Sequence, residues 1–315
     1  MTTVGLDDQS ANQGVDTEPA RRSLVRRLLA DSSVLVGGII IVVFVLAAIF
    51  APLLAKLAGQ DPYTYHLDKL GADTAPAGFG GGISAEHWFG VEPLTGRDLF
   101  SIVVYGARTS LLVGVAATIV SLILGVAIGI VAGYFGGWTD RIISRVTDVV
   151  FGFPGLIFMI TLGAVVPAAF PKPVLIIIVI GFFGWPSIAR VVRGQTLSLK
   201  ERNYVVAAEA SGAGPGHILL VQLLPNLVAT IIVFATISIP GKIGTEAALS
   251  FLGVGVPPPT PAWGRSIGEA INWISVDPMF LVFPGAALFL VTLGFNVFGD
   301  GLRDVLDPRT QGLER

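Results

Sequence analysis

Six long apolar stretches dominate the sequence and restrict its fold more than any other feature. Each approaches the roughly 20 residues that an α-helix needs to cross the hydrocarbon core of a bilayer. The predicted spans run from Val34 to Leu54, Leu111 to Ala132, Val149 to Val166, Val174 to Ile188, Leu227 to Phe251 and Met279 to Phe298. Only 13% of the residues are charged, whereas soluble domains contain about 25%. The sequence therefore predicts an all-α integral membrane protein with six transmembrane helices, surrounded by lipid.

The first apolar run is too long for a signal peptide, whose apolar region has about 7–15 residues. We therefore expect it to be retained as the first span.

The polar N-terminus separates a tail from the membrane domain. Residues 1–31 are polar and then basic, and we predict that they form a cytoplasmic tail that is partly disordered. Residues 32–315 form the predicted six-span domain.

The distribution of basic residues predicts the orientation in the membrane, because Lys and Arg accumulate on the cytoplasmic side. With a cytoplasmic N-terminus, thirteen basic residues lie inside: Arg21, Arg22, Arg26, Arg27, Arg141, Arg145, Arg190, Arg193, Lys200, Arg202, Arg303, Arg309 and Arg315. Seven lie elsewhere: Lys56, Lys69, Arg97, Arg108, Lys172, Lys242 and Arg265. Both termini and residues 194–226 are therefore predicted to be cytoplasmic. Residues 59–110 form the predicted extracytoplasmic insertion, which ends in an interfacial helix from Leu99 to Arg108.

Motifs for several chemistries are missing from the sequence. It has no GxxxxGK[ST] phosphate loop, so we predict that this chain does not hydrolyse ATP. It also has no GxSxG or HExxH motif, no cysteine and only three separated histidines. The formal net charge of -2 argues against a nucleic-acid partner. We expect no catalytic residue, no metal site and no cofactor in this chain.

Two patterns within the spans have a structural interpretation. Gly125, Gly129 and Gly133 form a small-residue stripe, which we expect to pack within the bundle rather than against another subunit.

Lys242 and Glu246 are one helical turn apart in the fifth predicted span and can neutralise each other. We interpret them as a structural ion pair near the outer interface rather than as an ion site. Asp148 is a further ionisable residue, at the inner edge of the third span.

The most unusual polar stretch runs from Glu201 to Pro225. We predict a helix from Leu197 to Ser211 with Ser198 as a possible N-cap, followed by a sharp reversal at Gly212 and Gly214. Pro215 suits the first turn of a second helix. The alanines between these points leave a thin surface that fits a groove of a partner. On physical grounds alone, a docking element and a loop lying on lipid are equally compatible with this stretch.

This stretch resembles the EAA loop of binding-protein-dependent ABC importers, which has the pattern Glu-Ala-Ala, three residues, Gly, nine residues, Ile, one residue, Leu-Pro. The matching positions are Ala207, Ala208, Gly212, Leu224 and Pro225, whereas Val206 and Gln222 depart from the pattern. The resemblance implies an ATPase-coupling loop that comprises Ala207, Ala208, Glu209, Ala210, Ser211, Gly212, Ala213, Gly214, Pro215, Gly216, Leu224 and Pro225. The letters Glu246-Ala247-Ala248 are a decoy, because they lack the spaced Gly and Leu-Pro.

Further segments look like the C-type subunit of dipeptide and oligopeptide permeases. They are His87 to Gly90, Gly96 to Asp98, Tyr105 to Ser110, Trp185 to Gln195, Leu249 to Gly253, Pro258 to Gly264 and Gly299 to Pro308. The resemblance implies a type I ABC importer permease fold in a bacterial or archaeal plasma membrane. It also implies four partners: a homologous B-type permease, two ABC ATPase subunits that bind ATP and Mg, and an extracytoplasmic solute-binding protein. Residues expected to face the binding protein are Gly96, Arg97, Asp98, Pro259 and Trp263.

The resemblance implies di- or oligopeptides as the transported solute. Nickel, glutathione or another small solute remains an alternative within the same branch. A standalone channel or secondary carrier is an alternative of a different class. It would transport without ATP and without partner subunits.

Overall fold

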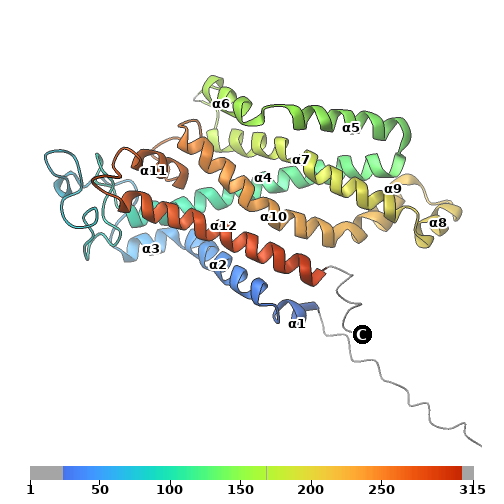
Figure 1. Ribbon diagram of the computed structural model, residues 1–315, viewed down its shortest axis with the longest axis horizontal. Coiled ribbons are helices and arrows are strands. Elements are labelled where there is room, and N and C mark those ends of the chain that lie inside the picture. The colour runs from blue at the N-terminus through green and yellow to red at the C-terminus, as the bar shows by residue number, and fades with distance from the viewer. Residues whose placement is uncertain (1–23, 168, 307–315) are drawn as a thin grey trace, which may run out of the picture.

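The structure is a computed structural model, and it describes residues 24–167 and 169–306. The predicted disorder of the N-terminal tail concerns mainly residues outside this part. The described chain is an elongated bundle of helices that run mostly along its long axis (Figure 1). Its elements are α1 (Leu24–Leu28), α2 (Ser32–Ile49), α3 (Ala51–Leu57), η1 (Leu67–Lys69), α4 (Leu99–Phe135), α5 (Gly137–Gly152), α6 (Gly155–Val165), α7 (Lys172–Leu199), α8 (Asn203–Ala210), α9 (Pro215–His217), the π-helical turn η2 (Ile218–Leu223), α10 (Leu224–Phe251), α11 (Trp263–Ala270) and α12 (Met279–Leu306).

The membrane-spanning elements agree with the predicted fold class. Five segments are long and apolar enough to cross a membrane: α2, α4, α7, the segment from α9 to α10, and α12. The bent pair α5 and α6 makes a sixth crossing if it is counted as one span. The bend is 72° and lies at Pro154, which has no N–H to continue the hydrogen bonding of α5. The all-α architecture with six predicted spans is confirmed in this form.

Several boundaries differ from the predicted ones. The prediction of a separate interfacial helix from Leu99 to Arg108 is wrong, because α4 continues without a break from Leu99 to Phe135. Asp98 starts this helix by accepting a hydrogen bond from the Ser101 backbone N–H at 2.7 Å, and no breaking residue follows. Helices α7 and α12 extend beyond the apolar runs because helical hydrogen bonding continues into their polar ends.

The small-residue stripe of α4 packs within the bundle, as predicted, and the structure identifies α7 as its partner. A Cβ atom added at Gly125 would lie 2.6 Å from the Ile188 side chain, and one at Gly129 would lie 2.6 Å from the Ala189 carbonyl oxygen. The equivalent distance for Gly133 is 2.6 Å, to the Thr196 Cβ atom. The backbones of α4 and α7 therefore approach each other more closely than any larger side chain would permit.

The remaining long helices complete the bundle around α4. Helix α2 packs along α12, where the Gly37 position faces the backbone of Phe298. Helix α10 lies between α4, α7 and α12. Buried apolar residues form three clusters along the bundle, centred on Trp263 and Phe280, on Ile176 and Ile180, and on Val205 and Leu223.

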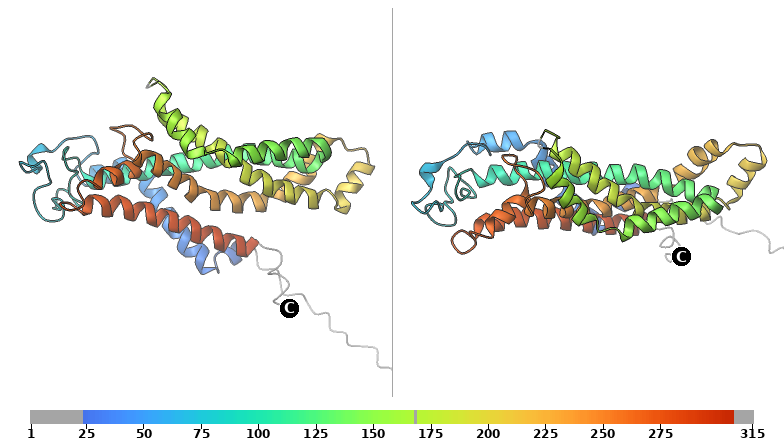
Figure 2. Two further views of the ribbon diagram at one scale, coloured as in Figure 1. Left: turned by 45° about the horizontal axis from the view of Figure 1, so that its top comes forward. Right: turned by 90° about the horizontal axis from the view of Figure 1, so that it is seen from above.

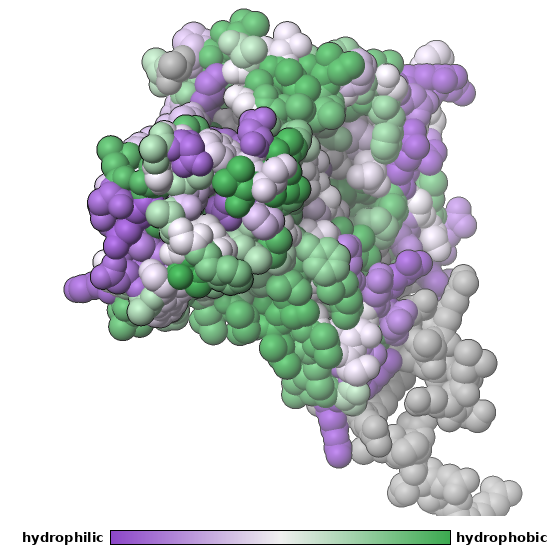
Figure 3. Space-filling view, turned by 60° about the vertical axis from the view of Figure 1, so that its left-hand side comes forward, coloured by the Kyte–Doolittle hydropathy of each residue, from purple (hydrophilic) through white to green (hydrophobic). Residues whose placement is uncertain are grey.

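The bundle has two distinct ends. We call one the α11 end, where residues 58–98 and α11 lie, and the other the α8 end, where α8, α9, α1 and the end of α12 lie (Figures 1 and 2). Arg27 donates a hydrogen bond to the Val305 carbonyl oxygen at 3.0 Å, so both ends of the described chain meet at the α8 end. Apolar side chains cover the flank of the bundle and polar ones gather toward its ends, as expected for a protein embedded in lipid (Figure 3).

The predicted ion pair between Lys242 and Glu246 is wrong. The Glu246 carboxylate is fully buried and accepts hydrogen bonds from Ser110 at 3.0 Å and Ser250 at 2.7 Å. The Lys242 ammonium instead reaches the Ile180 carbonyl oxygen on α7, at 3.3 Å. The two side chains leave α10 toward different neighbouring helices, Glu246 toward α4 and Lys242 toward α7. Their spacing of one helical turn was therefore not sufficient to pair them.

Because α4 and α7 approach so closely, adding a single methyl group at their contact should reduce the stability of the protein. Gly129→Ala should destabilise the protein by about 1–3 kcal/mol, because its Cβ atom would collide with the α7 backbone. We expect a lower apparent melting temperature in detergent. Gly194→Ala on α7 is the matched control, since this glycine is exposed and an added Cβ would have no neighbour within 4 Å. Equal melting temperatures for the two variants would contradict this packing.

Candidate functional site

The turn after α8 has the hydrogen bonding of a Schellman motif. The Gly212 N–H donates to the Glu209 carbonyl at 2.9 Å, and the Ala213 N–H donates to the Ala208 carbonyl at 3.0 Å. Gly212 has a φ of +86°, a conformation that glycine adopts without strain. The predicted reversal at Gly212 is confirmed. Pro215 then occupies the first turn of α9, as predicted.

This turn projects from the α8 end of the bundle (Figure 2). Most of its residues are exposed. Eight of the predicted coupling residues in this segment are exposed: Ala207, Glu209, Ala210, Ser211, Gly212, Gly214, Pro215 and Gly216. Ala208 and Ala213 are partly exposed. Five of the eight exposed residues are Ala or Gly, so the backbone lies close to the surface and is accessible to a partner. Leu224 and Pro225 begin α10 at the base of the projection.

Two side chains, Val205 and Glu209, attach α8 to the bundle. Val205 is completely buried and belongs to the apolar cluster that also contains Val192 of α7, Ile218, and Leu227 of α10. The Tyr134 hydroxyl of α4 adds a hydrogen bond to the Glu209 carboxylate at 3.3 Å. A displacement of α8 would therefore also displace residues of α4, α7 and α10.

The predicted N-cap at Ser198 is wrong, because α7 continues to Leu199 and α8 begins separately at Asn203.

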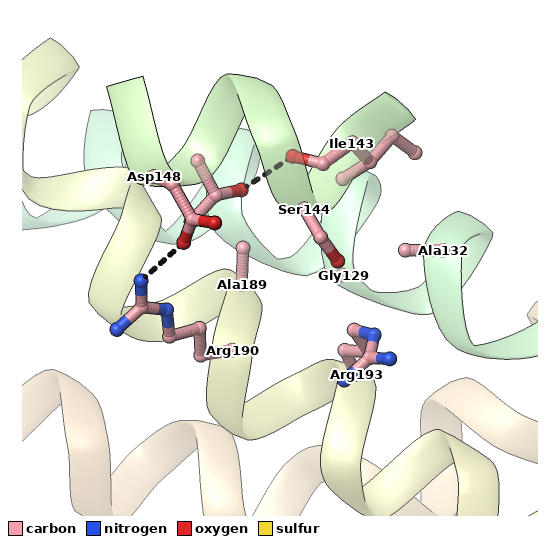
Figure 4. A pocket seen from close by; sticks show the side chains of 9 residues that line it. Gly129, Ala132, Ile143, Ser144, Asp148, Ala189, Arg190 and Arg193 are labelled. Atoms are coloured by element: carbon pink, nitrogen blue, oxygen red, sulfur yellow. Dashed lines mark hydrogen bonds and ion pairs between the residues drawn. The ribbon is translucent and has the colours of Figure 1, made fainter. Parts of the chain in front are cut away.

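A cavity of about 250 Å³ lies between α4, α5 and α7 (Figure 4). Arg190 of α7 donates to the Asp148 carboxylate of α5 at 2.8 Å, beside this cavity. Arg193 pairs with Asp140 through two hydrogen bonds, one of which measures 2.6 Å. Sequence reasoning missed both pairs, since their members are far apart in the chain. The only available signal was their position: Asp140 and Asp148 precede the third predicted span, and Arg190 and Arg193 follow the fourth, so all four were expected near the cytoplasmic side. The pairs join α5 to α7 and neutralise the charges around the cavity.

At the α11 end, a buried ion pair joins two loops. Arg97 donates to both carboxylate oxygens of Glu92, at 2.7 and 2.9 Å, and to the Pro259 carbonyl oxygen at 3.2 Å. Burial alone would lower the pKa of Arg97, but its hydrogen bonds and charge interaction with Glu92 raise that pKa above its ordinary value. Arg97 therefore stays charged, and its hydrogen bond to Pro259 holds residues 92–97 against the loop that precedes α11.

The other predicted binding-protein-facing residues have structural contacts in the same region. Asp98 caps α4 and lies 3.0 Å from the buried His87 ring. The Trp263 indole is buried and donates to the Val103 carbonyl at 2.8 Å. Gly96 is buried, with a φ of +68°. Of the five predicted residues only Pro259 is exposed. The buried four therefore shape this surface, and a docking role for the surface stays a prediction.

Comparison with known proteins supports a transport function for this architecture. Residues 125–312 match the family model described as "Binding-protein-dependent transport system inner membrane component". Residues 21–76 match the N-terminal transmembrane domain of oligopeptide transport permease C. The first match includes the α8–α9 turn and the loop before α11.

Relatives of similar length match nearly the whole chain. A dipeptide transport system permease protein from Alkalihalophilus pseudofirmus is 40% identical over 91% of this chain and 90% of the relative. An oligopeptide transport system permease protein from Bacillus subtilis is 38% identical over 96% of both chains. A glutathione transport system permease protein from Escherichia coli is 40% identical over 91% of this chain and 90% of the relative. The chain is therefore a multi-pass membrane protein that belongs to the family of inner-membrane components of binding-protein-dependent transport systems.

Proposed function

We propose that this chain is a permease subunit of an ATP-driven ABC importer and forms a translocation pathway for di- or oligopeptides with a second permease subunit. The observation that carries the proposal is the near full-length similarity to dipeptide and oligopeptide permease proteins. Glutathione, itself a peptide, is the second candidate, because a glutathione permease protein is equally similar. The protein acts as a conduit rather than as an enzyme.

The proposed assembly contains a homologous B-type permease, two ATPase subunits that bind ATP and Mg, and a solute-binding protein. We place the α8 end in the cytoplasm, because nine of the sixteen Lys and Arg residues in the described part of the chain lie on α1, the first part of α5, the stretch from the end of α7 to Arg202, and the end of α12. The α11 end then faces outward, with the loop containing Pro259 available to the binding protein. The exposed turn from Ala207 to Gly216 is the segment that an ATPase groove receives.

The coupling mechanism follows from how α8 is attached. ATP-driven closure of the ATPase subunits moves the docked turn, and Val205 transmits this motion to the cluster shared by α7 and α10. Because α4 and α7 are packed backbone to backbone, they move as one body. The pathway then opens alternately to the two sides, which is a hinge-type rearrangement.

Reconstitution tests the proposed function. The chain with its B-type permease, ATPase subunits and binding protein should take up a labelled dipeptide into proteoliposomes only when ATP is supplied. Labelled glutathione and nickel serve as competing solutes in the same assay. Uptake by this chain alone, without ATP, would indicate a channel or secondary carrier and contradict the proposal.

Gly212→Asp tests the docking role of the turn. An L-residue at a φ of +86° is strained by roughly 1–2 kcal/mol, and the substitution also adds a charge to the proposed contact. We expect the permease pair to assemble but peptide uptake to fall at least about tenfold, the effect of about 1.4 kcal/mol on one step. Either ATPase binding or substrate-stimulated ATP hydrolysis should fall with it.

Gly59→Asp is the matched control for this variant. Gly59 also has a positive φ, of +74°, and an added Cβ at either position would have no neighbour within 4 Å. It lies at the α11 end, away from the proposed ATPase contact. Its substitution should leave ATP hydrolysis and ATPase binding close to wild type. Unchanged uptake and ATP hydrolysis in Gly212→Asp would refute the docking role.

A further inference from the structure

Lys242 is a basic residue in the middle of the bundle, and its environment differs from that of the other charged residues on the long helices. It lies on α10, beside the central parts of α4 and α7. The ammonium rests over Gly184 of α7 and close to Ser121 of α4, and any side chain at position 184 would displace it. Three helices thus surround one positive charge in the middle of the bundle.

Within the part of the chain that the structure describes, no carboxylate forms an ion pair with Lys242. Glu246, one turn along α10, is engaged by Ser110 and Ser250 instead. Among the described residues, the Lys242 ammonium donates a single hydrogen bond, to the Ile180 carbonyl oxygen at 3.3 Å. An ammonium has three N–H donors, so two remain available for another group.

The Lys242 side chain is also accessible from outside the chain. A charged residue with a purely structural role would instead be fully buried among its partners. The Lys242 side chain is partly exposed, and the neighbouring positions Gly241 and Gly244 are exposed glycines with open space above them. A charged group in contact with lipid hydrocarbon is strongly disfavoured, so ionisable residues in membrane spans face a bundle interior or an aqueous path. The exposed side of Lys242 therefore belongs to a path or to a contact with the second permease subunit.

We infer that Lys242 lies on the translocation pathway and recognises a carboxylate of the transported solute. This inference rests on the proposed function and narrows its substrate class. Every peptide with a free C-terminus, glutathione included, carries a carboxylate, and an ammonium forms a charge-assisted hydrogen bond with it. A positive charge at this position disfavours a free divalent cation, so peptides or glutathione fit this pathway better than nickel ions.

Lysine suits this role better than a tightly binding group would. The ammonium is a flexible point charge, whereas arginine would clamp a carboxylate with two parallel hydrogen bonds. A pathway residue has to attract the solute and also release it. The two remaining N–H donors of Lys242 can attract the solute carboxylate. The open space beside the side chain leaves the solute free to dissociate.

The test uses the complete transporter in proteoliposomes, driven by ATP and saturated with loaded binding protein. Three variants are compared with wild type: Lys242→Met removes the charge at similar length, Lys242→Arg keeps it, and Lys56→Met removes an exposed lysine on α3. The solutes are a dipeptide with a free carboxylate and the same dipeptide as its C-terminal amide. Uptake is normalised to the amount of loaded binding protein, and co-elution of the permease pair reports assembly.

Lys242→Met should lower uptake of the carboxylate dipeptide about tenfold, as expected for loss of one charge-assisted hydrogen bond. Uptake of the amide should change much less, Lys242→Arg should restore most of the lost carboxylate uptake, and Lys56→Met should resemble wild type. Unchanged carboxylate uptake in Lys242→Met would overturn the inference. An equal fall for both dipeptides, or a permease pair that no longer co-elutes, would also overturn it and would assign Lys242 to a contact with the second permease subunit.

The outcome for wild type separates this inference from the proposed function. If wild type takes up neither dipeptide with ATP, the proposed peptide transport itself fails. If wild type transports the dipeptide but Lys242→Met does not discriminate carboxylate from amide, only the role of Lys242 fails.

Discussion

The backbone contact between α4 and α7 is the interaction on which the rest of the structure depends. Gly125 and Gly129 allow these two helices to touch along the centre of the bundle, and α10 packs against both. A pair of helices in such contact has little freedom to slide, because each backbone blocks the other. Motion delivered at one end is therefore carried along the bundle rather than absorbed within it, which is what an energy-coupled conduit requires.

The two ends of the bundle use different means to present a surface. At the α8 end, a short helix and a glycine turn expose backbone and small side chains, with Val205 as the internal anchor. At the α11 end, the Arg97–Glu92 ion pair and the Trp263 indole lie below the surface and fix the loops above them. The α8 end is thin and suits insertion into a groove. The α11 end is a broader surface whose loops are held in place by buried contacts. Lys242 lies between them.

Most of the fold and part of the site could be predicted from local sequence. Run length predicted the spans, the glycine spacing predicted a close helix contact within the bundle, and Gly212 predicted the turn, because each depends on residues close together in the chain. Contacts between distant segments could not be predicted in this way. The Asp148–Arg190 pair was missed, and the expected Lys242–Glu246 pair failed because tertiary neighbours offered each side chain a different partner. A proline can either kink a helix or start one, so Pro154 alone did not predict the 72° bend between α5 and α6.

We propose that an ATPase subunit binds the turn after α8 and does not contact the opposite end of the bundle. The chain has no cysteine, so a single introduced cysteine can be cross-linked without background. Ala210→Cys, in membranes that contain the whole transporter, should cross-link to an ATPase subunit, whereas Gly59→Cys should not. Efficient cross-linking of Gly59→Cys to the ATPase, with none from Ala210→Cys, would contradict this account of the protein.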